Sequence, residues 1–188
     1  MNIKKVTVFG AGNLGARLAF HIAFNNFDVT VYDQDYSLLE EARTRFREFG
    51  DNYRQNSGAS KEQINAALAN IAYSMDITEA AGNAQLIIEA VAEDLEDKKS
   101  FYRELQKTAP QNAFFVSTSQ GLDPEILSKA SGRSENFLIL HFIGKISESP
   151  SLEIIALPAA RQNVLQTVAE FSETIGMEFD IKYPEKQN

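Results

Sequence analysis

The chain alternates between short apolar runs and longer segments in which apolar residues recur at helical spacing. Runs such as VTVF, LIIE and FFVS are rich in β-branched and aromatic residues, which is typical of strands. Strands that alternate with helices form a mostly parallel sheet with helices on both faces, so we predict an α/β, Rossmann-type, doubly wound fold. The expected strands are near 3–9, 27–33, 71–74, 85–91, 113–119, 136–142, 151–157 and 177–183.

Between the second and third strands, at about 35–70, the pattern predicts a helical excursion. Asp35 can cap its first helix, and Gly50 is expected to end that helix. After a polar stretch, Ser60 and Gln63 have the spacing of a capping box and predict a second helix. We interpret the arginines of this excursion as its solvated face.

The other helices are marked by similar signals. Asp76 with Glu79 predicts another capping box. Asp123 and Pro124 predict an N-cap and first turn, and Gly132 is expected to stop that helix. The remaining helices are expected at about 13–26, 94–107 and 160–176.

Composition narrows the classes of function. A chain of 188 residues with 44% hydrophobic content suits one domain over 1–188, with a short polar tail at about 184–188. The net charge of -8 and the dispersed basic residues argue against a nucleic-acid or membrane-surface partner. Because there are no cysteines, disulfides, thiolate metal sites and cysteine nucleophiles are excluded, and no metal is expected. No signal peptide or membrane-spanning run is apparent, so we expect a cytoplasmic protein.

The stretch GAGNLG lies where the first strand meets the first helix. Gly10 permits the tight turn, Gly12 lets a pyrophosphate approach the backbone, and Gly15 lets helix and strand pack closely. The free N–H groups of the first helical turn, at Asn13 and Leu14, would then face the anion. The motif therefore predicts a dinucleotide site, with a turn that binds another nucleotide as the alternative.

An acidic residue at the end of the second strand supports this interpretation. Asp33 lies 23 residues after Gly10, near the usual distance for a carboxylate that binds the adenosine ribose. Gln34 follows, and none of the next residues is an arginine that could receive a 2′-phosphate. The expected cofactor is therefore NAD, in preference to NADP.

The chain has two histidines, which differ in setting. His21 lies within the first helix at the edge of an apolar stripe and is interpreted as structural. His141 ends the run NFLILH at the carboxyl edge of the sheet, where α/β sheets bind ligands. Glu153 follows within another apolar run, and a carboxylate there needs a partner. If the strands pair, Glu153 would orient the imidazole for acid–base chemistry; the alternative is an ion pair with no catalytic function.

These motifs resemble the N-terminal NAD-binding domain of the 3-hydroxyacyl-CoA dehydrogenase family, whose relatives include 3-hydroxybutyryl-CoA dehydrogenases and the lambda-crystallin type of sugar-acid dehydrogenase. The resemblance covers nearly the whole chain and rests on GAGNLG, VYD, the helical excursion, IIEAVAEDLEDKK, FFVSTSQGL and HFIGKISESPSLEII. It implies that His141 and Glu153 form a catalytic dyad, in which the histidine takes the proton of a 3-hydroxyl while hydride passes to NAD, or the reverse. It also implies a ribose and nicotinamide wall made by Ala90, Val91, Glu93 and Lys98.

The chain departs from the family's pattern at several positions. Thr118, Ser119, Gln120 and Gly121 stand where the family has Asn-Thr-Ser-Ser. Thr118 thus replaces an asparagine that contacts the cofactor, and Gln120 replaces the serine that holds the substrate oxygen, although its amide can still donate a hydrogen bond. Gly144 and Lys145 replace the family's Asn-Pro.

The chain ends at KYPEKQN, where the family continues into a helical domain that supplies dimer contacts and one wall of the acyl cleft. We therefore expect this C-terminal helical domain to be absent and a homodimer to cover the apolar surface. The excursion also shows no Ser and Lys pair of the kind that grips coenzyme A in the family.

Two classes of function remain open. The first is an NAD-dependent oxidoreductase acting on a small-molecule substrate, either a 3-hydroxyacyl thioester or a related 3-hydroxy acid. The second is a non-catalytic NAD-binding module, such as a redox sensor, that has lost the substrate side.

Overall fold

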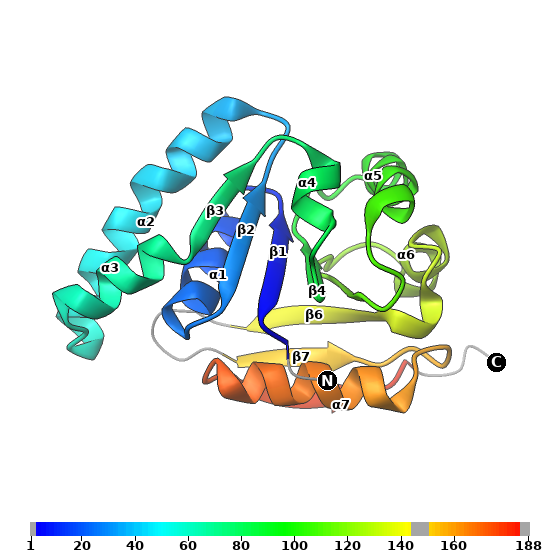
Figure 1. Ribbon diagram of the computed structural model, residues 1–188. Helices are drawn as coiled ribbons and strands as arrows, with labels where there is room; N and C mark the ends of the chain where they lie inside the picture. The colour runs from blue at the N-terminus through cyan, green and yellow to red at the C-terminus, as the bar shows by residue number, and fades with distance from the viewer. Residues whose placement is uncertain (1–2, 144–150, 185–188) are drawn as a thin grey trace.

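The computed structural model describes residues 3–143 and 151–184, and its strands form one twisted sheet (Figure 1). Within this part of the chain the strand order is β3-β2-β1-β4-β5-β6-β7-β8. β6 and β7 pair antiparallel, and all other neighbours pair parallel, which confirms the predicted mostly parallel sheet. The strands are β1 (Lys5–Phe9), β2 (Asp28–Tyr32), β3 (Ile71–Ser74), β4 (Leu86–Glu89), β5 (Phe114–Ser117), β6 (Phe137–Ile143), β7 (Ser151–Ile155) and β8 (Glu178–Lys182).

Helices cover both faces of the sheet, as the doubly wound fold requires. One face packs against α1, α2, α3 and α7, and the other against α4, α5 and α6. The helices are α1 (Asn13–Phe24), α2 (Tyr36–Ser57), α3 (Lys61–Ala69), α4 (Ile77–Ala81), α5 (Leu95–Thr108), α6 (Pro124–Ala130) and α7 (Gln162–Thr174), with a short 3-10 turn, η1 (Ser134–Asn136).

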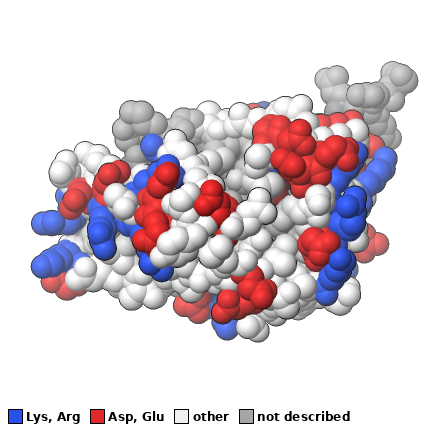
Figure 2. Space-filling model, turned by 90° about the horizontal axis from the view of Figure 1, so that it is seen from above, with Lys and Arg blue, Asp and Glu red and all other residues white. Residues whose placement is uncertain are grey.

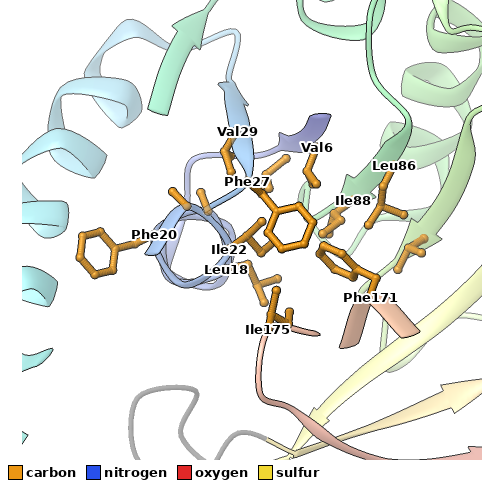
Figure 3. Packing of buried hydrophobic residues seen from close by; sticks show 14 of the residues in the cluster. Val6, Leu18, Phe20, Ile22, Phe27, Val29, Leu86, Ile88, Phe171 and Ile175 are labelled. Carbon is orange, nitrogen blue, oxygen red and sulfur yellow. The ribbon is translucent and has the colours of Figure 1, made fainter. Parts of the chain in front are cut away.

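The core follows from the alternation of side chains along the strands. In β1, Val6 and Val8 belong to the hydrophobic cluster beneath α1 and α7, whereas Phe9 belongs to the cluster beneath α5. Figure 3 shows Leu18 and Ile22 of α1 beside residues at the end of α7, while Phe20 turns toward the helical excursion. The excursion is therefore anchored to the same core as the sheet.

The sequence predicts most element boundaries closely. Every predicted strand is present, with ends within two residues of the expected ones. The capping box of Ser60 and Gln63 is confirmed, and Asp123 caps α6 with Pro124 in its first turn. Gly132, with a φ of +64°, follows the end of α6, as expected. The predicted tail at about 184–188 lies outside the described residues beyond Pro184.

The structure corrects the predicted end of the first helix of the excursion. α2 continues through Gly50 to Ser57, and the left-handed residue that ends it is Gly58. A Cβ on Gly50 would lie 2.6 Å from Cγ2 of Ile64 in α3. Glycine is present because two helices pack closely there, which is a tertiary reason that the local pattern does not reveal.

The second predicted capping box is also corrected. Asp76 caps α4 by accepting hydrogen bonds from the backbone N–H groups of Thr78 and Glu79. The Glu79 carboxylate, however, accepts a 2.6 Å hydrogen bond from the Ser74 hydroxyl, and the N–H of Asp76 donates to the same hydroxyl. The Ser74 hydroxyl thus lies between the N–H of Asp76 and the carboxylate of Glu79. The direct hydrogen bond that would complete a capping box is therefore not made.

Candidate functional site

A cleft of about 940 Å³ opens at the carboxyl edge of the sheet, above β1 and β4. Strand order reverses between these two strands, and such switch points are where open α/β sheets bind ligands. Figure 2 views this edge, and the middle of the face is largely white, with Asp and Glu around it. Eleven of the predicted site residues line the cleft: Gly10, Gly12, Asn13, Leu14, Asp33, Gln34, Ala90, Val91, Glu93, Thr118 and Gln120.

The glycine turn has the geometry that a dinucleotide site requires. Gly10 has a φ of +105°, and a Cβ there would lie 2.3 Å from the carbonyl oxygen of Ala90. A Cβ on Gly15 would lie 1.9 Å from the carbonyl oxygen of Gly10, so this glycine permits the close approach of helix and turn. Above Gly12 the space is open, since apart from its neighbours in the chain no heavy atom of the described residues lies within 4 Å of the position of a Cβ. Gly15 itself is not among the residues that line the cleft.

The N-terminus of α1 provides the electrostatic half of this site. Gly12 is the N-cap, and as a glycine it has no side chain to accept a hydrogen bond from the first turn of α1. The N–H groups at Asn13 and Leu14, which line the cleft, have no acceptor within the helix. With the positive end of the helix dipole behind them, they fit a pyrophosphate anion.

Asp33 stands beside the glycine turn at the end of β2. Its Oδ2 accepts a 2.8 Å hydrogen bond from the N–H of Ala11, and its Oδ1 accepts one of 3.0 Å from the N–H of Asp35. The carboxylate is therefore fixed in place and faces the cleft. Arg45 comes within 3.5 Å of the Ala11 carbonyl, but its guanidinium is paired with Glu41 at 2.8 Å.

All charged side chains that line the described cleft are negative. Among the described lining residues there are four carboxylates and no lysine or arginine. A 2′-phosphate at the ribose would therefore meet repulsion without a compensating cation, which supports the predicted preference for NAD over NADP. The four carboxylates are Asp33, Glu93, Asp97 and Glu104.

A buried polar cluster, which the sequence analysis missed, lies under the cleft. The carboxylate of Glu89, at the end of β4, is fully buried. It accepts hydrogen bonds from Lys98 Nζ at 2.5 Å and the Ser117 hydroxyl at 2.6 Å. The Tyr102 hydroxyl at 3.2 Å and the N–H of Val91 at 2.9 Å complete its shell. The signal that could have revealed it is a glutamate within the apolar run LIIE, because a buried carboxylate needs partners.

Tyr102 shows how strongly this cluster is shielded from water. Burial raises the pKa of its hydroxyl well above the usual value, and the neighbouring charge of Glu89 raises it further. Tyr102 is therefore a neutral donor to Glu89. The cluster is structural support for the cleft and not part of its surface.

Lys98 does not lie where the resemblance implies. Only 1% of its surface is exposed, and it is not part of the described wall of the cleft. Its ammonium binds Glu89 and donates to the carbonyl of Val91 at 3.2 Å. It also lies 3.3 Å from Oε2 of Glu93. Lys98 thus contacts Glu93, which lines the cleft, but does not line the cleft itself.

The strand register brings the two predicted catalytic positions together. His141 of β6 pairs directly with Glu153 of β7, so their side chains share one face of the sheet. The imidazole Nε2 of His141 lies 2.8 Å from the Ser119 carbonyl oxygen, and the Glu153 carboxylate lies 3.7 Å from Lys182 Nζ. Neither residue lines the described cleft, so their catalytic role stays a prediction.

The segment at the end of β5 connects His141 to the cleft. Thr118 and Gln120 line the cleft, and the residue between them supplies the carbonyl that His141 contacts. Gln120 is exposed, whereas Thr118 is largely buried and its N–H donates to the Glu89 carbonyl. Gly144 and Lys145, the other departure from the family's pattern, lie outside the described residues.

His21 has the structural position that the sequence predicts. It is 7% exposed, and its Nε2 lies 2.8 Å from the carbonyl oxygen of Ile175. Its Nδ1 lies 2.5 Å from the hydroxyl of Tyr53 in α2. Both ring nitrogens are occupied within the protein, and His21 does not line the described cleft.

Residues 3–143 and 151–184 contain neither a cluster of metal-ligating side chains nor a helix that could span a membrane. No group of three or more His, Cys, Asp or Glu side chains in these ranges is placed to hold a metal ion. Among the described helices, none combines the length and the apolar character needed to cross a membrane.

Comparison with known proteins gives a consistent family. The family model described as 3-hydroxyacyl-CoA dehydrogenase, NAD binding domain, matches residues 5–179. Mitochondrial hydroxyacyl-coenzyme A dehydrogenase from Sus scrofa is 27% identical over 179 residues, which cover 93% of this chain and 57% of that protein. A probable 3-hydroxybutyryl-CoA dehydrogenase from Bacillus subtilis is 23% identical over 176 residues. The chain thus spans a little over half the length of these curated relatives.

Solved structures agree with this result. A structure described as showing substrate-directed dual catalysis of dicarbonyl compounds by diketoreductase is 35% identical, with a TM-score of 0.92. The match covers 100% of this chain and 66% of that one. A 3-hydroxybutyryl-CoA dehydrogenase from Escherichia coli shares the fold at 22% identity and a TM-score of 0.91, over 97% of this chain and 39% of that one.

Proposed function

The chain belongs to the family of the NAD-binding domain of 3-hydroxyacyl-CoA dehydrogenase, and from this membership we propose that it is an NAD-dependent oxidoreductase. The proposed reaction is hydride transfer between NAD and a 3-hydroxyacyl thioester or a related 3-hydroxy acid. The observation that carries the proposal is the cleft at the switch point, in which the glycine turn and Asp33 lie side by side.

The residues present fit NAD. The α1 N-terminus and the open space above Gly12 would hold the pyrophosphate, and Asp33 would accept hydrogen bonds from the adenosine ribose. Ala90, Val91 and Glu93 would form the wall on the other side of the glycine turn. When bound, NAD supplies the hydride acceptor of the oxidation, and NADH the donor of the reverse reaction.

His141 is the candidate for the proton that accompanies hydride transfer. The Ser119 carbonyl can only accept, so Nε2 of His141 carries the hydrogen in this contact. Nε2 faces the segment that carries Gln120 into the cleft. In the reduction, the protonated imidazole of His141 would donate its Nε2 proton to a substrate oxygen that replaced the Ser119 carbonyl; in the oxidation, a neutral imidazole with its hydrogen on Nδ1 would accept the hydroxyl proton at Nε2.

Two observations favour a second function, a module that binds NAD without chemistry. The Nε2 of His141 is already occupied by the Ser119 carbonyl, and Gln120 stands where the family has a serine. Such a module would keep the cofactor cleft and lack turnover.

The substrate should be sought in a panel of compounds chosen to match the enzymes that this chain resembles. A diketoreductase is 35% identical to this chain, and hydroxyacyl-coenzyme A dehydrogenases are also similar. Loss of NADH absorbance should therefore be followed with 3-oxoacyl-CoAs, 3-oxo acids and uncharged dicarbonyl compounds. Oxidation that depends on His141 supports the enzyme. Tight NADH binding with no oxidation in any panel member, and no effect of replacing His141, establishes the module in its place.

A further inference from the structure

The carboxylate of Glu93 gathers an unusual number of donors from one short segment. Its Oε1 accepts the Ser119 hydroxyl at 2.6 Å, the N–H of Gln120 at 3.0 Å and the N–H of Gly121 at 2.9 Å. These three residues lie 26 to 28 positions away in the sequence. A single oxygen therefore fixes the whole loop that follows β5, because charged acceptors make stronger hydrogen bonds than neutral ones.

The other oxygen of Glu93 is held from beneath. Oε2 lies 3.3 Å from the buried ammonium of Lys98, which is itself bound to Glu89. Glu89 is tied in turn to β5 through the Ser117 hydroxyl. Burial works to raise the pKa of Glu93, but the hydrogen bonds from Ser119 and Gly121 and the charge of Lys98 outweigh it and lower the pKa to about 2. Glu93 is thus ionised whenever the protein is folded near neutral pH.

The loop that Glu93 fixes contacts both the cleft and His141. Its Gln120 and Gly121 line the cleft. Its Ser119 carbonyl receives Nε2 of His141 at 2.8 Å. The orientation of the imidazole and the position of the Gln120 side chain therefore both depend on one backbone conformation.

We propose that Glu93 is a positioning residue, which holds residues 119–121 so that Gln120 faces the cleft and Nε2 of His141 is directed at the position of the Ser119 carbonyl. Lys98 serves the same end by keeping Glu93 in place from the buried side. The catalytic part of this inference rests on the proposed function, whereas the positioning itself does not.

An amide cannot replace the carboxylate in this arrangement. If a glutamine oxygen faced the loop, its NH₂ group would face the Lys98 ammonium, where two donors would meet. If the NH₂ group faced the loop, it would meet the N–H groups of Gln120 and Gly121. Glu93→Gln should therefore release the loop, while the overall charge of the exposed surface changes by only one unit. Glu96→Gln is the matched control, because Glu96 is an exposed carboxylate of α5 that pairs only with Lys99 in the described contacts.

Nuclear magnetic resonance offers a readout that does not need turnover. The chain has two histidines, so a histidine-labelled sample gives two imidazole spin systems, and His21 is an internal reference. In Glu93→Gln we expect His141 to lose its bias toward the Nε2–H tautomer while His21 is unchanged. The amide protons of Gln120 and Gly121 should exchange with solvent about tenfold faster or more. Glu96→Gln should alter none of these signals.

Kinetics then separate positioning from direct cofactor contact. With any 3-oxo substrate found, Glu93→Gln should lower kcat of the reduction by about 10- to 100-fold, because His141 donates from Nε2 in that direction and small displacements of catalytic groups cost that much. The change in the Kd for NADH should be smaller than the change in kcat. A loss confined to the Kd, with the His141 and loop signals unchanged, would overturn the proposal.

A second variant protects the test against a general loss of structure. Ser119→Ala removes one of the three donors and leaves the Ser119 carbonyl in place, so it should reproduce the amide-exchange effect at Gln120 and Gly121 in weaker form. If Glu93→Gln unfolds, unchanged exchange in Ser119→Ala would refute the proposal. If no substrate is found at all, the proposed function fails, and the tautomer and exchange measurements still decide whether Glu93 positions the loop.

Discussion

At the scale of single residues, the carboxylates around the cleft differ in how much of their acceptor capacity is already used. A carboxylate offers about four lone-pair sites. Glu89 accepts four hydrogen bonds from the protein, and Glu93 accepts three and contacts Lys98. Asp33 accepts one on each oxygen and lines the cleft. Of these three carboxylates, Asp33 is therefore the one with capacity left for a ligand.

Replacing Asp33 tests its role at the ribose. Asp33→Ala should weaken NAD binding by about 1.5–3 kcal/mol, or roughly 10- to 150-fold, because charged hydrogen bonds are lost. NADP binding should weaken less, since the repulsion of its extra phosphate is also removed. Calorimetric titration measures both. Asp35→Ala is the control, because Asp35 caps α2 and is not part of the described cleft wall. Equal affinities of the unmodified chain for NAD and NADP would contradict this assignment.

Replacing His141 tests the proton transfer. His141→Gln should lower turnover by about 10²–10⁴-fold, which is the usual contribution of a general acid or base. NAD affinity should change little, because His141 does not line the described cleft. Steady-state kinetics and titration on the same preparation provide the comparison. A parallel loss of binding and turnover would indicate that His141 supports the cleft and does not handle the proton.

At the scale of elements, the sequence predicts what depends on neighbours in the chain. The box of Ser60 and Gln63 and the cap at Asp123 were predicted correctly because a helix end is decided within a few residues. The prediction that Gly50 ends the helix is wrong because the reason for this glycine lies in another helix, where Ile64 approaches it. A glycine inside a helical pattern looks the same whether it ends the helix or lets a partner approach.

The same distinction explains the site. The glycine turn and Asp33 belong to one motif of known spacing, and the structure brings them together. The contacts of Glu93 with residues 119–121 span a similar separation of 26 to 28 positions, but no motif or periodic pattern marks them. Likewise, the pairing of His141 with Glu153 follows from strand register, but the contact of His141 with the Ser119 carbonyl depends on the loop between strand and helix.

The packing of α2 on α3 gives a prediction at this scale. Gly50→Ala gains about 1 kcal/mol of helix propensity but places a methyl group 2.6 Å from Ile64 Cγ2, and such overpacking costs about 1–3 kcal/mol. Ile64→Leu removes that branch, so Gly50→Ala should be less destabilising in the Ile64→Leu background. Urea unfolding of the four proteins of this cycle gives the coupling. Additive effects would show that Gly50 and Ile64 do not compete for space.

At the scale of the whole molecule, the last strand of the sheet offers a surface for association. β8 is one of the two edge strands of the described sheet, and large apolar side chains near it and at the end of β6 are exposed: Ile143 at 49%, Ile181 at 39% and Tyr183 at 67%. The predicted homodimer stays a prediction, and Ile181→Lys with Tyr183→Lys should convert it to a monomer. Light scattering at micromolar concentration measures the mass. A monomer in the unmodified protein would refute the dimer.

One buried contact joins three distant parts of the chain. His21 of α1 receives the hydroxyl of Tyr53 from α2 at Nδ1 and donates from Nε2 to the carbonyl of Ile175, just after α7. A carbonyl accepts only, so the neutral ring satisfies both partners as the Nε2–H tautomer. Burial raises the pKa of Tyr53 to about 12, so its hydroxyl remains a neutral donor. A protonated ring would turn Nδ1 into a second donor facing this hydroxyl.

The stability of the whole fold should therefore depend on pH through His21. Burial lowers the pKa of His21 from 6.5, and the hydrogen bond to the Ile175 carbonyl offsets this only in part. Below about pH 6.5 the unfolded chain binds a proton that the folded chain resists, so the free energy of unfolding should fall as pH decreases through this range, and be unaffected by His21 above it. Urea unfolding between about pH 5 and pH 8 measures this slope. The total loss of unfolding free energy is roughly 1.4 kcal/mol for each unit by which the pKa of His21 differs between the folded and the unfolded chain. His21→Gln should flatten the slope below pH 6.5, while His141→Gln, the change at the other histidine, should leave it in place. If the slope disappears with His141→Gln and survives His21→Gln, the histidine that couples stability to pH is the one at the sheet edge and not the one that joins the three helices.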